Sequence, residues 1–426
     1  MIYTTRMKPW RVIGLLSGTS MDGVDVAAVE FRLRAGVIES LPLGYDSLPY
    51  PETLRRELVS LTRSEDKGPS AWCGLEAETG RAFAAAARYG VEELARGRAD
   101  LIGSFGQTVR HETVRGGTLG TLQLGGSARI AEATGLPVLA DPRSRDVAAG
   151  GQGAPLAPVL DVLWLAGLFP PVWTTSSPDG VLALNVGGIA NITVVGRGEP
   201  IAYDTGPGNA LIDAAAELVG AEEGRDTDGT LAARGRVRPD LLERLLADEY
   251  FHLSPPKTAD KEHFGLEYLR NALAAVSEVA APDLLRTVTE LTVRTVTEAC
   301  AAHEPGLVIA SGGGVANPVL MSGLRRELGR HGAELNTSGQ HGIPPDAKEA
   351  FLAALLGFLG MHGIAGNIAS CTGAEGPRVL GTLTPGNRPL STPEPVGTPV
   401  TALRISAPSA FHTPGRESTC ASSTWQ

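Results

Sequence analysis

Two stretches of the sequence share the same order of apolar strand, polar turn and apolar strand. The segments are Gly14–Asp25 (GLLSGTSMDGVD) and Gly187–Asn191 (GGIAN), each with apolar residues before and after the turn. Small residues in such a turn let backbone N–H groups approach a phosphate closely, hydroxyls add donors, and an Asp can position a hydrated Mg2+. One such turn is compatible with an ordinary hairpin. Its recurrence predicts a duplicated α/β fold with a nucleotide between the two halves.

The length and charge of the chain restrict the classes of protein that fit it. A chain of 426 residues is too long for one compact core and favours two domains. Its 37 basic and 47 acidic residues give a net charge of −10 without a basic stripe, which argues against nucleic acid as a partner. The four cysteines are scattered and indicate neither a zinc site nor a disulfide framework. No apolar run has the length of a membrane span or a signal core, so we expect a cytoplasmic protein without a membrane partner.

A Gly-rich polar stretch that begins at Asp141 separates two expected lobes. We expect residues 10–140 to form the N-terminal lobe, completed by residues 363–386. Residues 141–362 are expected to form the C-terminal lobe. Residues 387–426 are rich in Pro, Ser, Thr and Gly with little periodicity, and this composition predicts a disordered tail.

Seven motifs follow one another along the chain. They are Gly14–Asp25, Gly103–His111, Ala140–Pro158, Asn185–Thr193, Asp204–Asp213, Ser311–Met321 and Leu380–Pro385. In this order they resemble the anhydro-N-acetylmuramic acid kinase family, which belongs to the sugar kinase, Hsp70 and actin superfamily. The resemblance covers nearly the whole chain except the tail.

This resemblance implies an α/β fold of two ribonuclease-H-like lobes, of the actin and hexokinase type, with a central ATP cleft. In the family, water opens the internal bridge of 1,6-anhydro-N-acetylmuramic acid, a sugar of peptidoglycan recycling, while ATP phosphorylates the released O6. The product is N-acetylmuramic acid 6-phosphate. Such chemistry needs a carboxylate that deprotonates water, together with donors and Mg2+ around the transferred phosphoryl group.

The resemblance also implies roles for individual residues. Asp204, at the end of a predicted strand and ahead of a Gly-Pro-Gly turn, matches the family's catalytic base. Glu349 matches a glutamate close to that base, with a solvated helix residue as the alternative. Asp22 is the expected Mg2+ residue, acting through water. The ATP residues form a first phosphate stretch, a second phosphate turn and an adenosine loop: Gly18, Thr19, Ser20, Met21, Asp22, Gly23, Val24 and Asp25; Gly187 and Gly188; and Gly312, Gly313 and Gly314.

Three polar residues are candidates for binding the sugar, namely Gln107, Arg143 and Arg145. An arginine can pair through two hydrogen bonds with the lactyl carboxylate that distinguishes muramic sugars from glucosamines. A surface position is the alternative for either arginine.

The sequence departs from the family pattern at three places. Phe105 stands where the family has His, and Pro142 stands where it usually has Phe. The stretch Thr258–Lys261 (TADK) replaces a Ser-Thr-Gly-Arg type sequence. These departures bear on substrate affinity and specificity, whereas Asp204 and the phosphate turns match the pattern.

Two other functions stay open at this stage. One is a kinase of the same fold that phosphorylates another sugar without ring opening, and the other is an actin-like nucleotide switch. The Gly-rich stretch 148–155 and the turn after Asp204 suit a small polar substrate better than a partner interface. A Rossmann dehydrogenase has little support, because no Gly-x-Gly-x-x-Gly run occurs. A homodimer is implied by the family resemblance alone.

Overall fold

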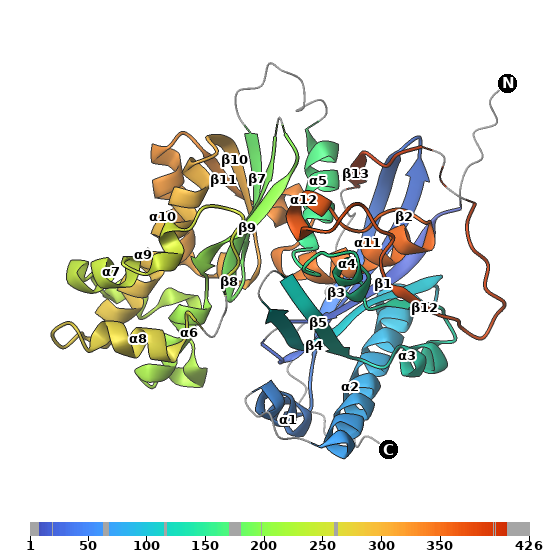
Figure 1. Cartoon of the computed structure of the whole chain (residues 1–426), viewed down its shortest axis with the longest axis horizontal. Coiled ribbons are helices and arrows are strands. Elements are labelled where there is room, and N and C mark those ends of the chain that lie inside the picture. Colours follow the sequence, from blue (N-terminus) through green and yellow to red (C-terminus); the bar gives the residue numbers. More distant parts are fainter. Residues whose placement is uncertain are drawn as a thin grey trace.

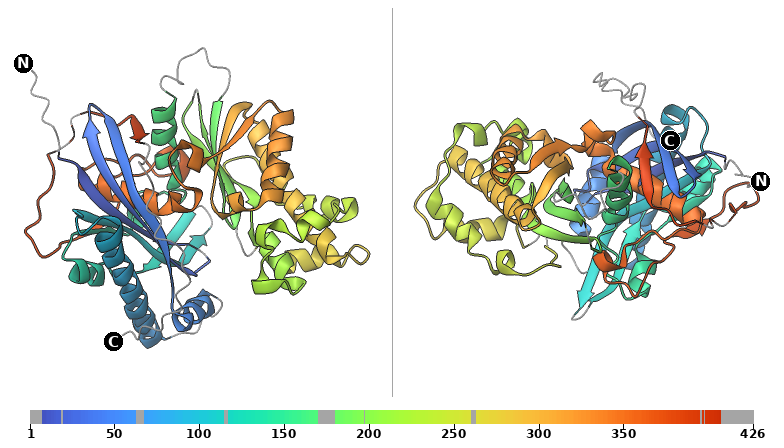
Figure 2. Two further views of the ribbon diagram at one scale, coloured as in Figure 1. Left: turned by 180° about the vertical axis from the view of Figure 1, so that it is seen from behind. Right: turned by 90° about the horizontal axis from the view of Figure 1, so that it is seen from above.

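The chain forms two lobes that stand side by side, each built around one β-sheet (Figure 1). Views from behind and from above show the same division (Figure 2). The computed structural model describes residues 8–18, 20–62, 68–114, 117–169, 180–196, 198–259, 263–394, 396 and 398–406.

The first sheet contains eight of the described strands, in the order β12-β6-β4-β1-β2-β3-β13, with β5 paired to β4. Strands β1, β2 and β3 form an antiparallel meander, and β4 and β6 continue the sheet parallel to β1. The bounds are β1 (Trp10–Ser17), β2 (Gly23–Arg34), β3 (Val37–Pro49), β4 (Leu101–Val114), β5 (Gly117–Leu124), β6 (Val138–Ala140), β12 (Thr382–Thr384) and β13 (Ala402–Ile405).

The second sheet has the order β11-β10-β7-β8-β9 in the described part of the chain. Strands β7, β8 and β9 are antiparallel neighbours, and β10 and β11 are parallel to β7. The bounds are β7 (Gly180–Val186), β8 (Ile189–Val195), β9 (Ile201–Pro207), β10 (Pro305–Ser311) and β11 (Glu334–Thr337).

The two sheets therefore repeat one topology. Three antiparallel strands are followed by two parallel strands on the side of the first strand, as β3-β2-β1-β4-β6 and as β9-β8-β7-β10-β11. This repetition confirms the duplicated α/β fold that the two strand-turn-strand patterns predict, with the two ribonuclease-H-like lobes that the family resemblance implies. It also places the first hairpin turn of each lobe, β1–β2 and β7–β8, at equivalent positions.

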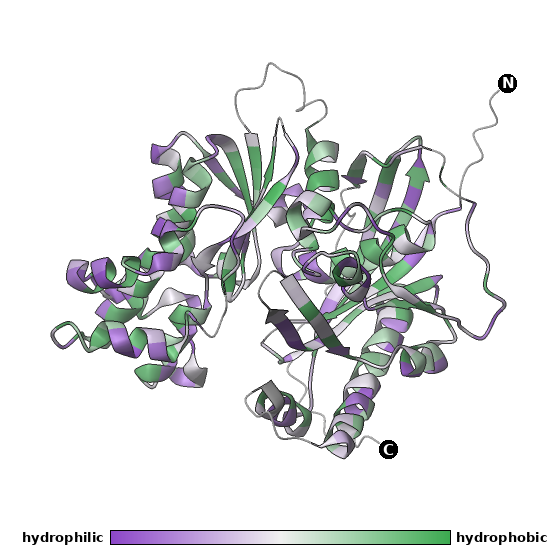
Figure 3. Cartoon of the chain, viewed as in Figure 1, coloured by the Kyte–Doolittle hydropathy of each residue, from purple (hydrophilic) through white to green (hydrophobic). Residues whose placement is uncertain are grey.

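Helices cover both sheets, and their inward faces are apolar while their outer faces are polar (Figure 3). Among the described helices, none is both long and apolar enough to cross a membrane. The bounds are α1 (Glu52–Thr62), α2 (Pro69–Tyr89), α3 (Ser127–Thr134), α4 (Ser144–Ala148), α5 (Ala157–Leu168), α6 (Ala210–Leu218), α7 (Pro239–Leu246), α8 (Leu266–Leu273), α9 (Ala281–Ala301), α10 (Pro318–Arg330), α11 (Lys348–Met361) and α12 (Ala369–Thr372).

The first sheet is buried on both faces. Along β1, Val12 and Leu16 belong to the core shared with α5 and α11, whereas Ile13 and Leu15 belong to the core shared with α1 and α2. This alternation follows from the two-residue period of a strand. A strand buried on both faces has few polar positions, which explains why β1 reads as a nearly continuous apolar run.

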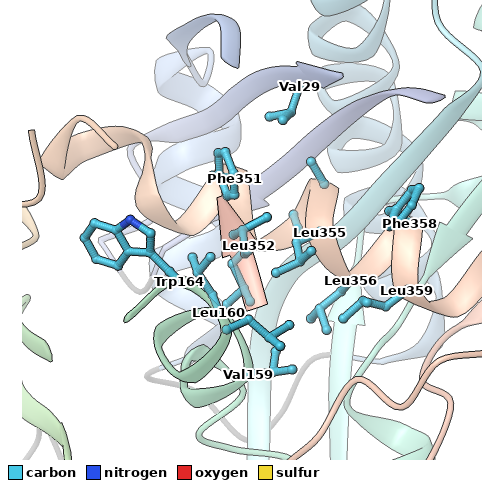
Figure 4. Packing of buried hydrophobic residues seen from close by; sticks show 14 of the residues in the cluster. Val29, Val159, Leu160, Trp164, Phe351, Leu352, Leu355, Leu356, Phe358 and Leu359 are labelled. Atoms are coloured by element: carbon cyan, nitrogen blue, oxygen red, sulfur yellow. The ribbon is translucent and has the colours of Figure 1, made fainter. Parts of the chain in front are cut away.

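Helices α5 and α11 join the two lobes through one hydrophobic core (Figure 4). Leu160 and Trp164 of α5 belong to this core together with Phe351 and Leu355 of α11. The same cluster includes Ile309 and other residues of the second sheet, so it is continuous across the junction.

The close packing of α11 on the first sheet depends on two glycines. A Cβ atom added at Gly14 of β1 would lie 1.9 Å from the backbone oxygen of Ala350, and one at Gly103 of β4 would lie 2.2 Å from that of Ala353. Any larger residue would push the helix away, because real atoms do not approach this closely.

The division into lobes differs from the expectation, most clearly at α11. Residues 141–362 were expected to form the C-terminal lobe, but α11 at Lys348–Met361 packs on β1, β2 and β4 of the first sheet. Its buried residues surround most of the helix, so the sequence pattern does not reveal which lobe it contacts.

The expected disordered tail, residues 387–426, also requires a correction. Strand β13 lies within it, pairs in parallel with β3, and packs against α5. Leu403 is fully buried, and a Cβ at Gly167 of α5 would lie 1.8 Å from its backbone oxygen. A four-residue strand has too few positions to show a period, so no pattern of residues indicates it. Residues 407–426 lie outside the described residues.

Candidate active site

Three glycine-containing turns of the second lobe meet at one end of its sheet. The N–H of Gly208, after β9, donates to the oxygen of Gly188 in the β7–β8 turn at 2.8 Å, and the N–H of Asn209 donates to the oxygen of Gly187 at 2.8 Å. Gly312, after β10, has a φ of +85°, and a Cβ there would lie 2.8 Å from the oxygen of Val186. The structure thus brings the predicted second phosphate turn and the adenosine loop together.

The adenosine loop continues from Gly312 into a short 3-10 helix, η6 (Gly313–Ala316). A Cβ at Gly314 would lie 2.4 Å from a side-chain carbon of Val186, so this position requires glycine. Gly313 is open, since a Cβ there would lie 4.0 Å from Asn209 Nδ2. These tight and open glycines form a compact loop that a flat ligand can approach.

The first phosphate stretch forms the turn between β1 and β2. The N–H of Met21, which has a φ of +52°, donates to the oxygen of Gly18 at 3.2 Å, and Ser20 Oγ donates to Asp22 Oδ1 at 2.8 Å. Gly23 packs closely, because a Cβ there would lie 2.4 Å from the backbone oxygen of Leu48. Thr19 lies outside the described residues, and Val24 is a buried residue of β2.

The side chain of Gln107 stabilises the turn between β1 and β2 through hydrogen bonds. Its side chain is fully buried, and its Nε2 donates to the oxygen of Gly18 at 3.1 Å. Its Oε1 lies 2.6 Å from Ser17 Oγ and accepts from the Tyr50 hydroxyl at 3.3 Å. The amide is therefore used within the protein, and a sugar contact would require exchange of these bonds.

Asp204 lies in β9 and is held by a segment 46 to 55 residues further along the chain. Its Oδ2 accepts from the N–H of Ala259 at 2.8 Å, and its backbone oxygen accepts from the Tyr250 hydroxyl at 2.6 Å. Its own N–H donates to the oxygen of Lys257 at 3.0 Å. Burial raises the pKa of Asp204 to about 6, while the Ala259 bond acts in the opposite direction.

The strand around Asp204 is longer than predicted. It was expected to end at Tyr203, but β9 continues to Pro207, with a bulge opposite Ala190 and Asn191 of β8. A bulge re-aims the side chains beside it, which is common next to functional sites.

Glu349 lies in the first turn of α11 and reaches solvent. The dense protein around it removes part of its hydration and raises its pKa, while the charges of Arg143 and Lys348 lower it. Among the described residues, the hydrogen bond to the Asp204 carboxylate comes from the N–H of Ala259 and not from Glu349.

Glu349 instead belongs to a group of carboxylates near the first phosphate stretch. Burial raises the pKa of Asp25 to about 6, against a hydrogen bond with Ser47. The negative charges of Glu349, Asp22 and Asp346 raise it further. The turn thus carries an excess of negative charge that a cation would relieve.

Arg143 lies close to this group. Its Nη1 donates to the oxygen of Gly153 at 2.8 Å, and its guanidinium carbon lies 5.4 Å from the ring centre of Phe105. Its Nε is buried without a hydrogen-bond partner among the described residues. Burial lowers the pKa of Arg143, and the charges of Glu349 and Asp141 raise it. Phe105 therefore contributes a cation–π contact in place of an imidazole.

Arg145 is placed differently from Arg143. It lies in the short helix α4, and its side chain is exposed to solvent. The structure thus separates the two candidate arginines, because Arg143 is partly buried and interacts with Glu349 whereas Arg145 is exposed.

Sequence reasoning missed several residues that shape the site. Tyr250 and Ala259 hold Asp204, as described above, and Lys257 Nζ lies 4.6 Å from the ring centre of Tyr250. Arg225 of the second lobe has Nη2 3.8 Å from Asp22 Oδ2 of the first phosphate stretch. The sequence signal near these residues was the departure at Thr258–Lys261, which includes Ala259.

Comparison with known proteins identifies the family. The family model for anhydro-N-acetylmuramic acid kinase matches residues 10–386. The chain is 47% identical over 397 residues to the anhydro-N-acetylmuramic acid kinase of Streptomyces coelicolor, covering 93% of this chain and 99% of the relative. It is 45% identical over 406 residues to that of Rhodococcus erythropolis, covering 93% and 100%.

Solved structures are more distant. A ROK family glucokinase from Streptomyces griseus matches with a TM-score of 0.34 and 14% identity, over 82% of this chain and 99% of that chain. The match to the family model and the near-complete coverage of the relatives are decisive. The chain therefore belongs to the anhydro-N-acetylmuramic acid kinase family.

Proposed function

We propose that this protein is an ATP-dependent kinase that opens 1,6-anhydro-N-acetylmuramic acid with water and phosphorylates its O6, giving N-acetylmuramic acid 6-phosphate. The observation that carries the proposal is the environment of Asp204. Its carboxylate has a pKa raised to about 6, and it precedes the turn that contacts Gly187 and Gly188. A base of this kind is mostly ionised at neutral pH and can still accept a proton.

Asp204 acts through one defined oxygen in this proposal. Among the described residues, the hydrogen bond to its carboxylate comes from the N–H of Ala259 and engages Oδ2. Oδ1 is then the atom that takes the proton of the attacking water. Fixing one carboxylate oxygen orients the other, which lowers the entropy cost of reaching the reactive geometry.

The two lobes supply the proposed ATP site. The turn at Gly18–Asp25 and the turn at Gly187 and Gly188 are equivalent hairpin turns of a duplicated fold, which supports their common role in binding phosphates. The compact loop Gly312–Gly314 is assigned to adenosine.

A hydrated Mg2+ fits beside Asp22. This carboxylate is exposed and lies in the negatively charged group that includes Asp25 and Glu349. Among the described residues, no three His, Cys, Asp or Glu side chains converge to hold a metal ion. A cation held through water by Asp22, and otherwise by ATP, therefore fits better than one ligated by protein alone. When bound, Mg2+ supplies positive charge to the phosphates.

Arg143 is the favoured partner for the lactyl carboxylate of the sugar. Its buried Nε has no protein acceptor in the described structure, and its charge interacts with that of Glu349, which lies near the first phosphate stretch. Arg145, on the surface of α4, and Gln107, engaged below the phosphate turn, are weaker candidates. From the family resemblance we also propose a cytoplasmic homodimer, which light scattering after size-exclusion chromatography would test.

Ring opening and phosphorylation depend on each other in this scheme. The bridge oxygen has no proton to lose, so O6 becomes a nucleophile only as its bond to C1 breaks. The oxygen of water forms the new bond to C1, its proton goes to Asp204, and O6 takes the γ-phosphoryl group from ATP.

The experiment that tests this function follows ADP release with three sugars: 1,6-anhydro-N-acetylmuramic acid, N-acetylmuramic acid and N-acetylglucosamine. We expect rapid turnover with the anhydro sugar alone. Reaction in 18O-labelled water should place the label on C1 of the product. An equal rate with the open sugar would instead indicate an ordinary hydroxyl kinase, and label at O6 would show that water attacks C6 rather than C1. ATP hydrolysis that no sugar accelerates would indicate a nucleotide switch.

A further inference from the structure

A buried ion pair lies at the junction of the two lobes. Lys348 Nζ, in the first turn of α11, lies 2.6 Å from Asp161 Oδ1 of α5, and the two side chains are only 6% and 3% exposed. Asp161 Oδ2 also accepts from the hydroxyl of Thr193 in β8 at 2.8 Å. One pair thus connects both junction helices with the second sheet.

The same lysine reaches the end of β10. Its Nζ donates to Ser311 Oγ at 3.3 Å, and Ser311 is the residue before Gly312 of the adenosine loop. The N–H of Gly312 in turn lies 3.4 Å from its acceptor, the oxygen of Pro345, in the short 3-10 turn η8 (Pro345–Ala347) that leads into α11. The beginning of α11 is therefore bonded to the nucleotide end of the second sheet.

The remainder of α11 belongs to the first lobe. Its backbone lies against Gly14 and Gly103 too closely for any side chain to intervene. Glu349 directly follows Lys348 and reaches the solvent, where its charge interacts with Arg143. Of two adjacent residues in one helix turn, Lys348 thus bonds to the residue before the proposed ATP loop, and Glu349 interacts through its charge with the arginine proposed for the sugar.

A buried ion pair is often energetically unfavourable compared with apolar side chains of the same volume. Moving two charges out of water costs several kcal/mol for each ion, and apolar residues of similar volume often stabilise a core as well or better. Directional bonds, however, fix geometry that apolar contacts leave free. The three polar bonds of Lys348 and Asp161 therefore specify the position of α11 relative to the second sheet.

We propose that Lys348 is a positioning residue that couples the Gly312–Gly314 loop to Glu349, so that ATP and sugar strengthen each other's binding. This inference rests on the proposed function, because it assumes that these two places bind ATP and sugar. When ATP orders the loop, it fixes the positions of Ser311 and of Lys348, which is bonded to it. Lys348 in turn fixes the helix turn that carries Glu349. Thermodynamic linkage requires the reverse effect to be equally large.

The test measures binding of a non-hydrolysable ATP analogue by calorimetry, with and without saturating 1,6-anhydro-N-acetylmuramic acid, in the presence of Mg2+. In the natural protein, we expect the sugar to tighten analogue binding at least ~5-fold. The double variant Lys348→Met with Asp161→Asn removes both charges together and keeps an acceptor for Thr193. It should bind each ligand alone and lose most of the coupling.

Two further variants separate coupling from general damage. Ser311→Ala keeps the ion pair but removes the bond from Lys348, together with the bonds that Ser311 Oγ donates to Leu184 and Asn185 of β7, and it should lower the coupling factor. The matched control Glu327→Gln with Arg330→Met removes an ion pair of 2.7 Å that lies within α10 and should leave the coupling unchanged. Full coupling in both junction variants, or none in the natural protein that binds both ligands, overturns the inference. Failure of the natural protein to bind either ligand instead overturns the proposed function.

Discussion

At the scale of single residues, the proposed base gives the sharpest expectation. Asp204→Asn keeps the shape of the side chain and its contact with Ala259, but the amide cannot accept a proton from water. We expect kcat to fall at least ~100-fold while the affinity for an ATP analogue stays nearly unchanged. Steady-state ADP release and calorimetry provide the two measurements. Turnover close to that of the natural protein would remove Asp204 from the mechanism.

The raised pKa of Asp204 predicts the pH dependence of the rate. The base works only when it is ionised, so kcat should decrease as the pH falls through about 6. Ala259→Pro removes the N–H that stabilises the ionised carboxylate, so it should raise this pKa and move the decrease to higher pH. Thr258→Pro, one position earlier, provides the control for introducing a proline into this segment. An unchanged profile in the Ala259 variant would show that its N–H does not tune the base.

The sequence predicted site residues best where a local pattern marks them. Asp204 stands out because an apolar strand leads into it and a Gly-Pro-Gly turn follows. From the sequence, Gln107 is a candidate sugar ligand. Only the fold shows that its amide donates a hydrogen bond to the backbone oxygen of Gly18. The bond from Ala259 to Asp204 is made by backbone, so no side-chain pattern announces it.

At the scale of elements, strand β13 predicts a clear stability difference. Leu403→Ala removes a fully buried side chain between β3 and α5 and should lower the free energy of unfolding by about 2–4 kcal/mol. Arg404→Ala, at the exposed neighbouring position, is the matched control and should change it by less than about 0.5 kcal/mol. Thermal and urea denaturation measure both. Equal stability of the two variants would show that β13 does not hold this edge.

Strands that form long apolar runs between turn residues were predictable from the sequence. Elements that depend on a partner far away in the sequence were not. The runs that became β1, β2 and β7 are apolar over several residues and flanked by turn residues. Strand β13 has four residues and exists because β3 leaves an edge open and α5 offers an apolar surface. The lobe to which α11 belongs could not be predicted for a related reason, because this helix is buried on nearly every side and contacts both lobes.

At the scale of the whole molecule, the fit of α11 on the first sheet links stability with activity. Gly103→Ala adds a Cβ that would lie 2.2 Å from the oxygen of Ala353, so the helix must shift. We expect a loss of about 1–3 kcal/mol of stability, as for other overpacked cores. Because α11 carries Glu349, kcat should fall as well. Gly120→Ala of β5, where a Cβ would meet nothing within 4 Å, is the control. Normal activity in a destabilised Gly103 variant would contradict this link.

The duplicated topology was visible in the sequence as two hairpins, but the order in which the chain builds its lobes was not. The described strands of the second sheet all lie between Gly180 and Thr337, and no described strand of the first sheet lies between them in the sequence. The first sheet takes six strands from the beginning of the chain, and its strands β12 and β13, with the covering helix α11, from the end.

This arrangement has a consequence for biosynthesis, which proceeds from the N-terminus. When Thr337 has been translated, the second lobe possesses all of its strands, whereas the first still lacks α11. The half of the protein that is made first is therefore completed last. Until then, the apolar face of β1, β2 and β4 that α11 later covers stays exposed on the nascent chain.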